Sequence, residues 1–287
     1  MLTLQVALLK PTLVRTFLIA IIATSVIAGT FFLYASGKLG MNIPSYDGVA
    51  RAAIIDQLHD DIPNATFIEN ATGYLVAAGY KVDLFTTKDI TIDFYKNLPT
   101  KGYKFIVIRS HSGNAPVSDK NIDNSLSIFT GEKYDEKKYT FEQIMGFVQK
   151  SRAFTDEYAA KVQKEGGQMT LVNSDHSDPY FSVGSKFINE YMVGKFPGST
   201  IIIGGCNTLE NPSLADSLVK RGASAIIGWN KLVEAGHNDR VILEVLRSML
   251  VDKVDGKEAV HSAMHILGPD PQYSSELNYY SHDSQTA

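Results

Sequence analysis

Residues 200–208, Thr-Ile-Ile-Ile-Gly-Gly-Cys-Asn-Thr, decide the fold, because an apolar run stops here at two glycines and at Cys206, the only cysteine of the chain. A second such run, Tyr-Lys-Phe-Ile-Val-Ile-Arg at 103–109, leads into Ser110 and His111. Short apolar runs bounded by turn residues are typical of buried strands in a parallel sheet. The sequence therefore predicts a thiol and an imidazole at the carboxyl ends of two strands, where open α/β sheets bind ligands.

Strands and helices alternate on both sides of these runs. Strands are predicted at 51–56, 81–85, 103–109, 168–172, 200–206 and 223–229, and helices at 66–78, 91–97, 141–164, 185–192, 213–221, 239–251 and 256–266. The alternation predicts an α/β fold of three layers, a mostly parallel sheet with helices on both faces. Residues 113–140 are interpreted as a polar insertion outside the core, and a polar tail is expected from Pro269.

Composition narrows the classes of function. The chain has 287 residues, of which 44% are hydrophobic and 20% charged, an ordinary balance for a globular protein with a packed core. Its formal net charge of −4 provides no broad basic surface, so nucleic acid is not an expected partner. A single cysteine excludes an intrachain disulfide and a cysteine-cluster metal site.

The N-terminal region differs from this average. Residues 16–37 contain no charged side chain and are long enough to cross a bilayer as a helix, at about 1.5 Å per residue. We expect a cytoplasmic N-terminus at 1–15, a transmembrane helix at 16–37, a tether at 38–48 and a main domain at 49–287 outside the cytoplasm. A cleaved secretory signal is the alternative, although the apolar regions of such signals are usually shorter.

The chemistry of the two strand ends indicates a nucleophile pair. A thiol with an ordinary pKa of about 8.5 is mostly protonated at neutral pH, and a neighbouring imidazole activates it by lowering that pKa or by accepting the proton. Cys206 and His111 are therefore the candidate catalytic residues. The common alternative is structural, because free cysteines usually pack as small buried hydrophobes.

Attack of a thiolate on a carbonyl carbon creates an oxyanion that fixed N–H groups must stabilise. The backbone amides of Cys206, Ser112 and Gly113 are the candidate donors. Gly204 and Gly205, together with Gly113, are interpreted as letting the backbone approach a substrate closely.

Residues 206–229 are the most specific part of a wider resemblance. They read Cys-Asn-Thr-Leu-Glu-Asn-Pro-Ser-Leu-Ala-Asp-Ser-Leu-Val-Lys-Arg-Gly-Ala-Ser-Ala-Ile-Ile-Gly-Trp, and the candidate histidine precedes the cysteine in the chain. In this order and in this segment the chain resembles the caspase-like cysteine peptidases, which include caspases, legumain, gingipains, clostripain and separase. The resemblance extends over residues 50–266, with 113–140 as an insertion.

The resemblance implies a cysteine endopeptidase with Cys206 as nucleophile, His111 as general acid and base, and a peptide or protein as substrate. It also implies an oxyanion hole from the amides after His111 and at Cys206. The sequence departs from the family pattern at two positions. Ser112 stands where the family usually has glycine, and Gly204 stands where members that cleave after basic residues often carry an acid.

Other polar groups are weaker candidates. Asp56, Asp175, Asp178 and Trp229 are possible lining residues of a substrate pocket, and solvated loop carboxylates are the competing interpretation. No metal or cofactor is expected: His261 and His265 lie four apart on a predicted helix, but no glutamate base lies between them.

Two further interpretations of the whole chain stay open. A catalytically inactive caspase-like module, tethered to the membrane for binding, would have the same pattern with a buried Cys206. An acyl-transfer enzyme could use the same pair. The sequence leaves the oligomeric state, the cleavage specificity and any zymogen processing open.

Overall fold

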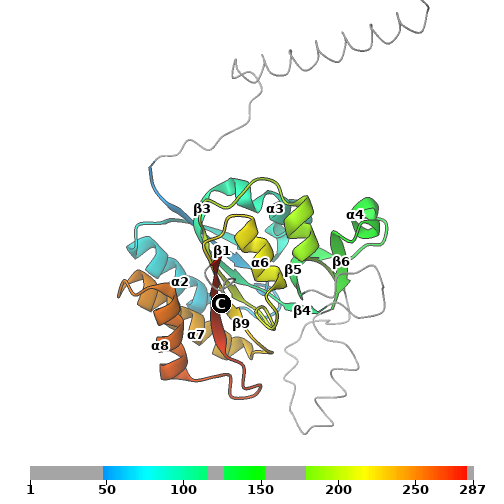
Figure 1. Cartoon of the computed structure of the whole chain (residues 1–287). Coiled ribbons are helices and arrows are strands. Elements are labelled where there is room, and N and C mark those ends of the chain that lie inside the picture. Colours follow the sequence, from blue (N-terminus) through cyan, green and yellow to red (C-terminus); the bar gives the residue numbers. More distant parts are fainter. Residues whose placement is uncertain (1–47, 115–125, 153–178, 283–287) are drawn as a thin grey trace, which may run out of the picture. The chain divides into compact units, whose positions relative to one another are not determined.

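A six-stranded sheet forms the centre of the computed structural model, which describes residues 48–114, 126–152 and 179–282. The strands are β1 (Arg51–Asp56), β2 (Lys81–Thr86), β3 (Tyr103–Arg109), β8 (Thr200–Gly204), β9 (Ala225–Trp229) and β10 (Leu277–Ser281). They lie in the order β10-β9-β8-β3-β1-β2, and only β10 runs antiparallel to its neighbour (Figure 1). The predicted α/β class with a mostly parallel sheet is confirmed.

Alternating side chains of the strands build a separate core on each face. Ala52 and Ile54 pack with α2 (Ala65–Ala77), α7 (Ala235–Leu250) and α8 (Gly256–Leu267). Ala53 and Ile55 pack with α3 (Ile92–Asn97), α6 (Ser213–Lys220) and the short helical turn η3 (Phe187–Tyr191). Strands buried on both faces need continuous apolar runs, which explains why the sequence pattern identified them.

A second, antiparallel sheet corrects the interpretation of residues 113–140 as a polar insertion. Its strands are β4 (Ser112–Asn114), β5 (Leu126–Lys133), β7 (Tyr180–Gly184) and β6 (Val148–Ser151), in the order β4-β5-β7-β6. The first five residues of β5 are buried, and Leu126 and Ile128 join the core on the α3 and α6 side. This apolar segment is short and lies between charged stretches, so the sequence pattern did not identify it as a strand.

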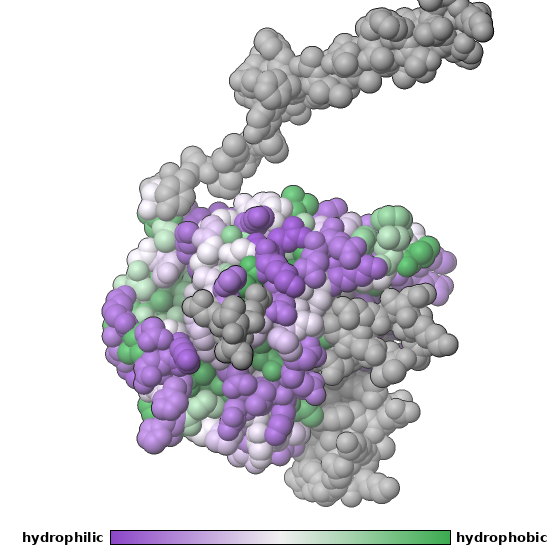
Figure 2. Space-filling view, in the orientation of Figure 1, coloured by the Kyte–Doolittle hydropathy of each residue, from purple (hydrophilic) through white to green (hydrophobic). Residues whose placement is uncertain are grey.

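Two other predicted elements are wrong. The helix expected at 141–164 does not continue past α4 (Thr140–Ile144), because the chain enters β6, and residues 153–164 lie outside the described residues. α4 leaves Phe141, Ile144 and Met145 exposed, which gives an apolar patch over this helix (Figure 2). The expected polar tail contains β10, an edge strand whose antiparallel pairing with β9 places Leu277 in the core.

Several expectations lie outside the described residues. These are the N-terminus at 1–15, the transmembrane helix at 16–37, nearly all of the tether at 38–48 and the strand at 168–172. The compact unit that carries all described residues begins at Gly48. Within residues 48–114, 126–152 and 179–282, no helix combines the length and apolar content that crossing a membrane requires.

Candidate active site

The ends of β3 and β8 bring His111 and Cys206 to the same edge of the sheet. The two strands are parallel neighbours with Arg109 opposite Gly204, and Ser110 N donates to Gly204 O at 3.1 Å. His111 and Cys206 therefore follow the last paired residues by the same two positions. The Ser112 hydroxyl donates to the Cys206 carbonyl at 2.6 Å, which ties the two chain segments together beyond the strands. The expected adjacency of the two strands is confirmed.

Gly205 makes this close approach possible. A Cβ atom at this position would lie 2.4 Å from Ser112 Oγ and 2.6 Å from Ser110 O, closer than real Cβ atoms approach other atoms. A Cβ at Gly204 would lie 2.5 Å from Ile242 Cδ1 in α7. The two glycines thus serve the packing of β8 against β3 and α7. Their expected close approach to a substrate stays a prediction.

Cys206 has a protonated thiol in this arrangement. The residue is half-buried, and its Sγ lies 3.8 Å from the Val233 carbonyl oxygen, to which it donates. Burial raises the pKa of the Cys206 thiol, and the nearby Asp270 carboxylate raises it further. Asp270 is itself buried and accepts the backbone N–H of Glu234 at 2.8 Å, so it also holds the loop that carries Val233.

This protonation state predicts a slow reaction with alkylating reagents. The thiolate is the reactive form, so a raised pKa leaves little of it at neutral pH. We expect iodoacetamide to label Cys206 at pH 7 more slowly than it labels free cysteine, with a rate that keeps rising above the ordinary cysteine pKa. Mass spectrometry of the single cysteine over pH 6 to 10 measures this rate. A rate that is already constant at pH 6 would indicate a preformed thiolate and contradict the prediction.

The backbone of His111 is fixed by hydrogen bonds on both sides. Its N–H donates to Gln57 Oε1 at 2.9 Å, and its carbonyl accepts from Phe129 N at 3.0 Å. The imidazole is half-buried, with its centroid 5.8 Å from that of the Phe129 ring. Gln57 is fully buried and follows β1 at the same edge. Sequence analysis missed Gln57, although a polar residue directly after a buried strand was a usable signal.

Two backbone amides remain as candidate oxyanion donors. The His111 carbonyl points to β5, and carbonyl and N–H point in opposite directions across a trans peptide, so the Ser112 N–H points away from β5. The described residues place no acceptor on the Cys206 N–H. Gly113 pairs with Ser127, and strand alternation directs its N–H toward β5. The structure therefore favours Ser112 and Cys206 and corrects the inclusion of Gly113.

A buried charge cluster lies beneath this edge. Arg109 Nε lies 2.9 Å from Asp239 Oδ1, and Arg109 Nη1 lies 3.0 Å from Asp56 Oδ1. All three side chains are almost inaccessible to solvent. Burial raises the pKa of Asp56, although Arg109 acts in the opposite direction. Asp56 is thus a structural ion-pair partner, which corrects its interpretation as a lining residue of an open pocket.

The remaining candidates do not form a substrate pocket or a metal site in the described residues. Trp229 is fully buried and donates from Nε1 to Asn238 Oδ1 at 2.8 Å, so it packs the core and does not line a substrate pocket. Asp175 and Asp178 lie outside the described residues. His261 and His265 are exposed on α8, and within the described parts of the chain no three His, Cys, Asp or Glu residues gather as a metal site requires.

Comparison with solved structures finds a similarity to the crystal structure of the Drosophila initiator caspase Dronc. The TM-score is 0.37 at 10% sequence identity, over 81% of this chain and 78% of that chain. No protein-family model matches the sequence, and comparison with curated proteins finds no match. Conclusions about the site therefore depend on the geometry of this chain.

Proposed function

We propose that the protein is a caspase-like cysteine peptidase that hydrolyses peptide bonds with Cys206 as nucleophile and His111 as general base. The observation that supports it most is the hydrogen bond of 2.6 Å from Ser112 Oγ to the Cys206 carbonyl. This bond, together with the matched register of β3 and β8, keeps the thiol-bearing and imidazole-bearing segments side by side. The order of histidine before cysteine in the sequence resemblance agrees with this assignment.

The proposed reaction has two steps. The thiol turns from the Val233 carbonyl, passes its proton to His111, and its sulfur bonds to the substrate carbonyl carbon. The N–H groups of Ser112 and Cys206 stabilise the oxyanion. The C–N bond breaks as His111 returns the proton to the leaving amine, which leaves a thioester. Water then gives a proton to His111 and its oxygen to the carbonyl carbon, and the proton restores the thiol as the acid is released.

A protonated resting thiol is compatible with this role. With the pKa of Cys206 raised by burial, a stable thiolate and imidazolium pair is not the starting state. His111 then acts as a base only when substrate displaces the thiol from the Val233 carbonyl. Gly204 supplies no carboxylate near the thiol, so a preference for lysine or arginine before the cleaved bond is not part of the proposal.

Digestion of a mixed peptide pool in H₂¹⁸O tests the function. The full 287-residue chain, kept in detergent micelles because of its apolar N-terminal segment, is expected to yield new carboxyl ends that carry one ¹⁸O. Mass spectrometry identifies the products. Transfer of the acyl group to an added amine without ¹⁸O incorporation would indicate the acyl-transfer alternative, and an unchanged pool would contradict hydrolysis.

One observation favours a second candidate, an inactive binding module. The Cys206 thiol is engaged by the Val233 carbonyl and its pKa is raised, as expected for a cysteine that only packs. A peptidyl electrophile separates the two candidates. In a peptidase, a peptidyl chloromethyl ketone alkylates Cys206 faster than chloroacetamide does, because the bound peptide brings the reactive carbon to the sulfur. In an inactive binding module, the peptidyl reagent alkylates Cys206 no faster than chloroacetamide.

The cellular location is also a proposal. Residues 16–37 would anchor the chain in a membrane as a single-pass helix and place residues 49–287 outside the cytoplasm. The uncharged sequence of this segment supports the proposal. Extraction of membranes with alkaline carbonate, which releases peripheral proteins, is expected to leave the protein in the pellet.

A further inference from the structure

The loop at 230–234, which connects β9 to α7, contacts the cysteine segment at two points. The Cys206 thiol donates to the Val233 carbonyl at 3.8 Å. The N–H of Asn207, the residue after the thiol, donates to the Lys231 carbonyl at 2.8 Å. The position of loop 230–234 therefore determines whether the Val233 carbonyl stays within reach of the thiol.

A turn at 270–276, between α8 and β10, fixes this loop. Asp270 Oδ2 accepts the Glu234 N–H at 2.8 Å, and Ser275 Oγ accepts the Lys231 N–H at 3.0 Å. The two side chains of the turn are 1% and 0% exposed, so water does not compete for these bonds. The turn thus holds the loop on both sides of the carbonyl that accepts the thiol.

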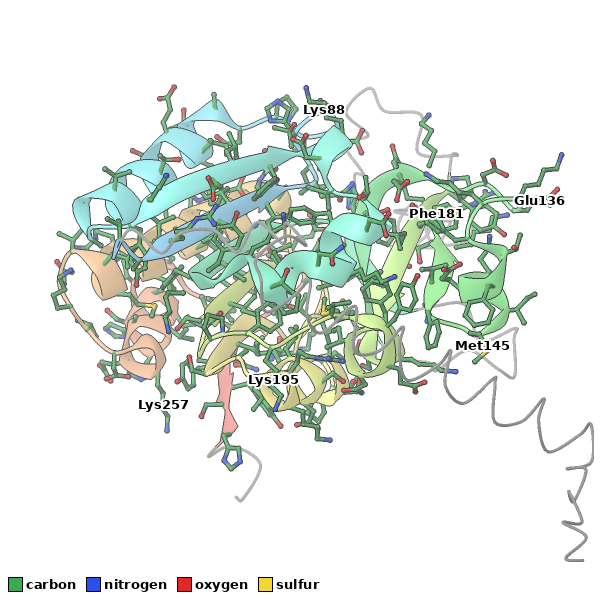
Figure 3. All side chains as sticks on the ribbon, turned by 90° about the horizontal axis from the view of Figure 1, so that it is seen from above. Lys88, Glu136, Met145, Phe181, Lys195 and Lys257 are labelled. Atoms are coloured by element: carbon green, nitrogen blue, oxygen red, sulfur yellow. The ribbon has the colours of Figure 1, made fainter. Side chains whose placement is uncertain are left out.

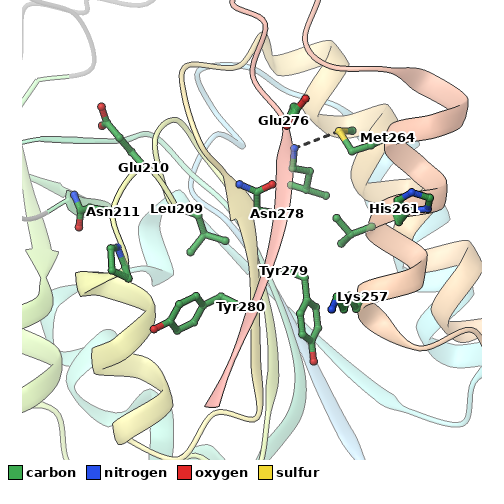
Figure 4. Close-up of a pocket in the computed structure, with 13 residues that line it drawn as sticks. Leu209, Glu210, Asn211, Lys257, His261, Met264, Glu276, Asn278, Tyr279 and Tyr280 are labelled. Carbon is green, nitrogen blue, oxygen red and sulfur yellow. Dashed lines mark hydrogen bonds between the residues drawn. The ribbon is translucent and has the colours of Figure 1, made fainter. Parts of the chain in front are cut away.

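The second oxygen of the same carboxylate keeps the turn in shape. Asp270 Oδ1 accepts the N–H groups of Gln272 and Tyr273 at 2.9 and 2.8 Å. Where the turn leads into β10, Leu277 N lies 3.3 Å from Met264 Sδ of α8 (Figure 4). A carboxylate has two accepting oxygens, whereas an amide has one. One carboxylate therefore organises the turn and ties it to loop 230–234.

We propose that Asp270 is a positioning residue that keeps the nucleophile in its resting state. Through loop 230–234 it holds the Val233 carbonyl against the Cys206 thiol, and release of this loop frees the thiol to pass its proton to His111. This role in catalysis rests on the proposed function, but the hold on the thiol can be measured without any substrate.

The charge of Asp270 acts in the same direction as its hydrogen bonds. Burial raises the pKa of the Cys206 thiol, and the Asp270 carboxylate raises it further, because one anion disfavours the formation of another nearby. Both effects oppose formation of the thiolate. The segments around the thiol also carry other titratable or charged side chains, all of which stay unchanged in the variants below: His111, Glu210, Lys231, Glu234, His237 and Glu276.

Alkylation of the single cysteine in Asp270→Asn tests this role on the full chain in micelles. The asparagine oxygen can keep the bonds within the turn, but its NH₂ group then faces the Glu234 N–H, and two donors cannot bond. We expect iodoacetamide to label Cys206 about tenfold faster at pH 7 than in the wild type, with a rate that levels off at a lower pH. Mass spectrometry measures both quantities. An unchanged rate overturns the proposal.

Asp255→Asn is the matched control. Asp255 caps α8 as Asp270 caps its turn, by accepting the N–H groups two and three residues further on, from Lys257 and Glu258 at 3.0 and 3.1 Å. It follows the far end of α7, a helix of 16 residues that extends about 24 Å from loop 230–234. Lys257 nearby points into solvent (Figure 3). The control should leave the alkylation rate unchanged, and an equal acceleration would indicate general loosening of the fold and overturn the proposal.

Ser275→Ala separates release of the loop from loss of charge. It removes the neutral acceptor of the Lys231 N–H, so we expect faster alkylation of Cys206 here too, by a smaller factor. Acceleration in Asp270→Asn without any in Ser275→Ala would mean that lost charge alone acts on the thiol, which overturns the proposal. If Asp270→Asn does not fold, the Ser275→Ala measurement decides.

Peptide hydrolysis, measured in parallel, distinguishes this proposal from the proposed function. Faster alkylation in both variants, with no hydrolysis by the wild type, would support the hold of Asp270 on the thiol and contradict the peptidase. Hydrolysis by the wild type, with alkylation unchanged in both variants, would support the peptidase and overturn the role of Asp270.

Discussion

Cys206→Ala is expected to lower the rate of peptide hydrolysis by about 10⁴-fold or more, because no other side chain at this edge can form the thioester. The fold should persist, since alanine occupies less space than cysteine and the hydrogen bond that the variant cannot form, from Sγ to the Val233 carbonyl at 3.8 Å, is weak. The measurement is the initial rate of cleavage of a selected peptide, together with the unfolding midpoint of each variant.

Ser224→Ala is the matched control. Ser224 is exposed and precedes β9 at the opposite edge of the sheet, so its hydroxyl cannot take part in catalysis. The double variant Cys206→Ala with His111→Ala should be no slower than Cys206→Ala alone. The two residues act together in one step, so once the first is removed, removing the second lowers the rate no further. Full activity in Cys206→Ala would show that another group performs the reaction and would exclude the proposed mechanism.

The sequence predicted the parts of the fold that local pattern controls. β3 and β8 are apolar over nearly their whole length, and α6 has one apolar face, so periodicity located them. β5 and β10 were missed for different reasons. β5 is a short buried run between charged stretches, and β10 is an edge strand whose pairing with β9 depends on tertiary contacts that no local pattern encodes.

The candidate site was predictable to the same degree. The positions of His111 and Cys206 at neighbouring strand ends followed from the rule for parallel sheets. Burial of Trp229 was predictable too, since it continues the alternation of Ile227 toward the α7 layer. The pairing of Arg109 with Asp56 could be predicted in part from the sequence, because both are charged residues at the ends of predicted strands. The third partner, Asp239, comes from α7 and required the tertiary structure.

Arg109→Met is expected to destabilise the folded state by about 3–5 kcal/mol, because it leaves two buried carboxylates without their cation. Arg109 also donates from Nη2 to the Ile62 carbonyl at 2.7 Å, so the variant loses a link between β3 and the loop after β1. Urea unfolding at pH 7 measures the difference. The matched control is Arg247→Met, which removes ion pairs at the surface with Glu244 and Asp252 and should change stability far less.

The deficit of Arg109→Met should shrink as the pH falls. Burial already raises the pKa of Asp56 in the presence of Arg109, and without the cation the carboxyl pKa in the folded state rises further above its unfolded value. A group whose folded pKa is raised favours the folded state at low pH and loses that contribution as the pH rises through the folded value. The variant should therefore recover stability relative to the wild type between pH 7 and pH 5. An equal deficit at both values would mean that poorer packing, and not unpaired charge, causes the destabilisation.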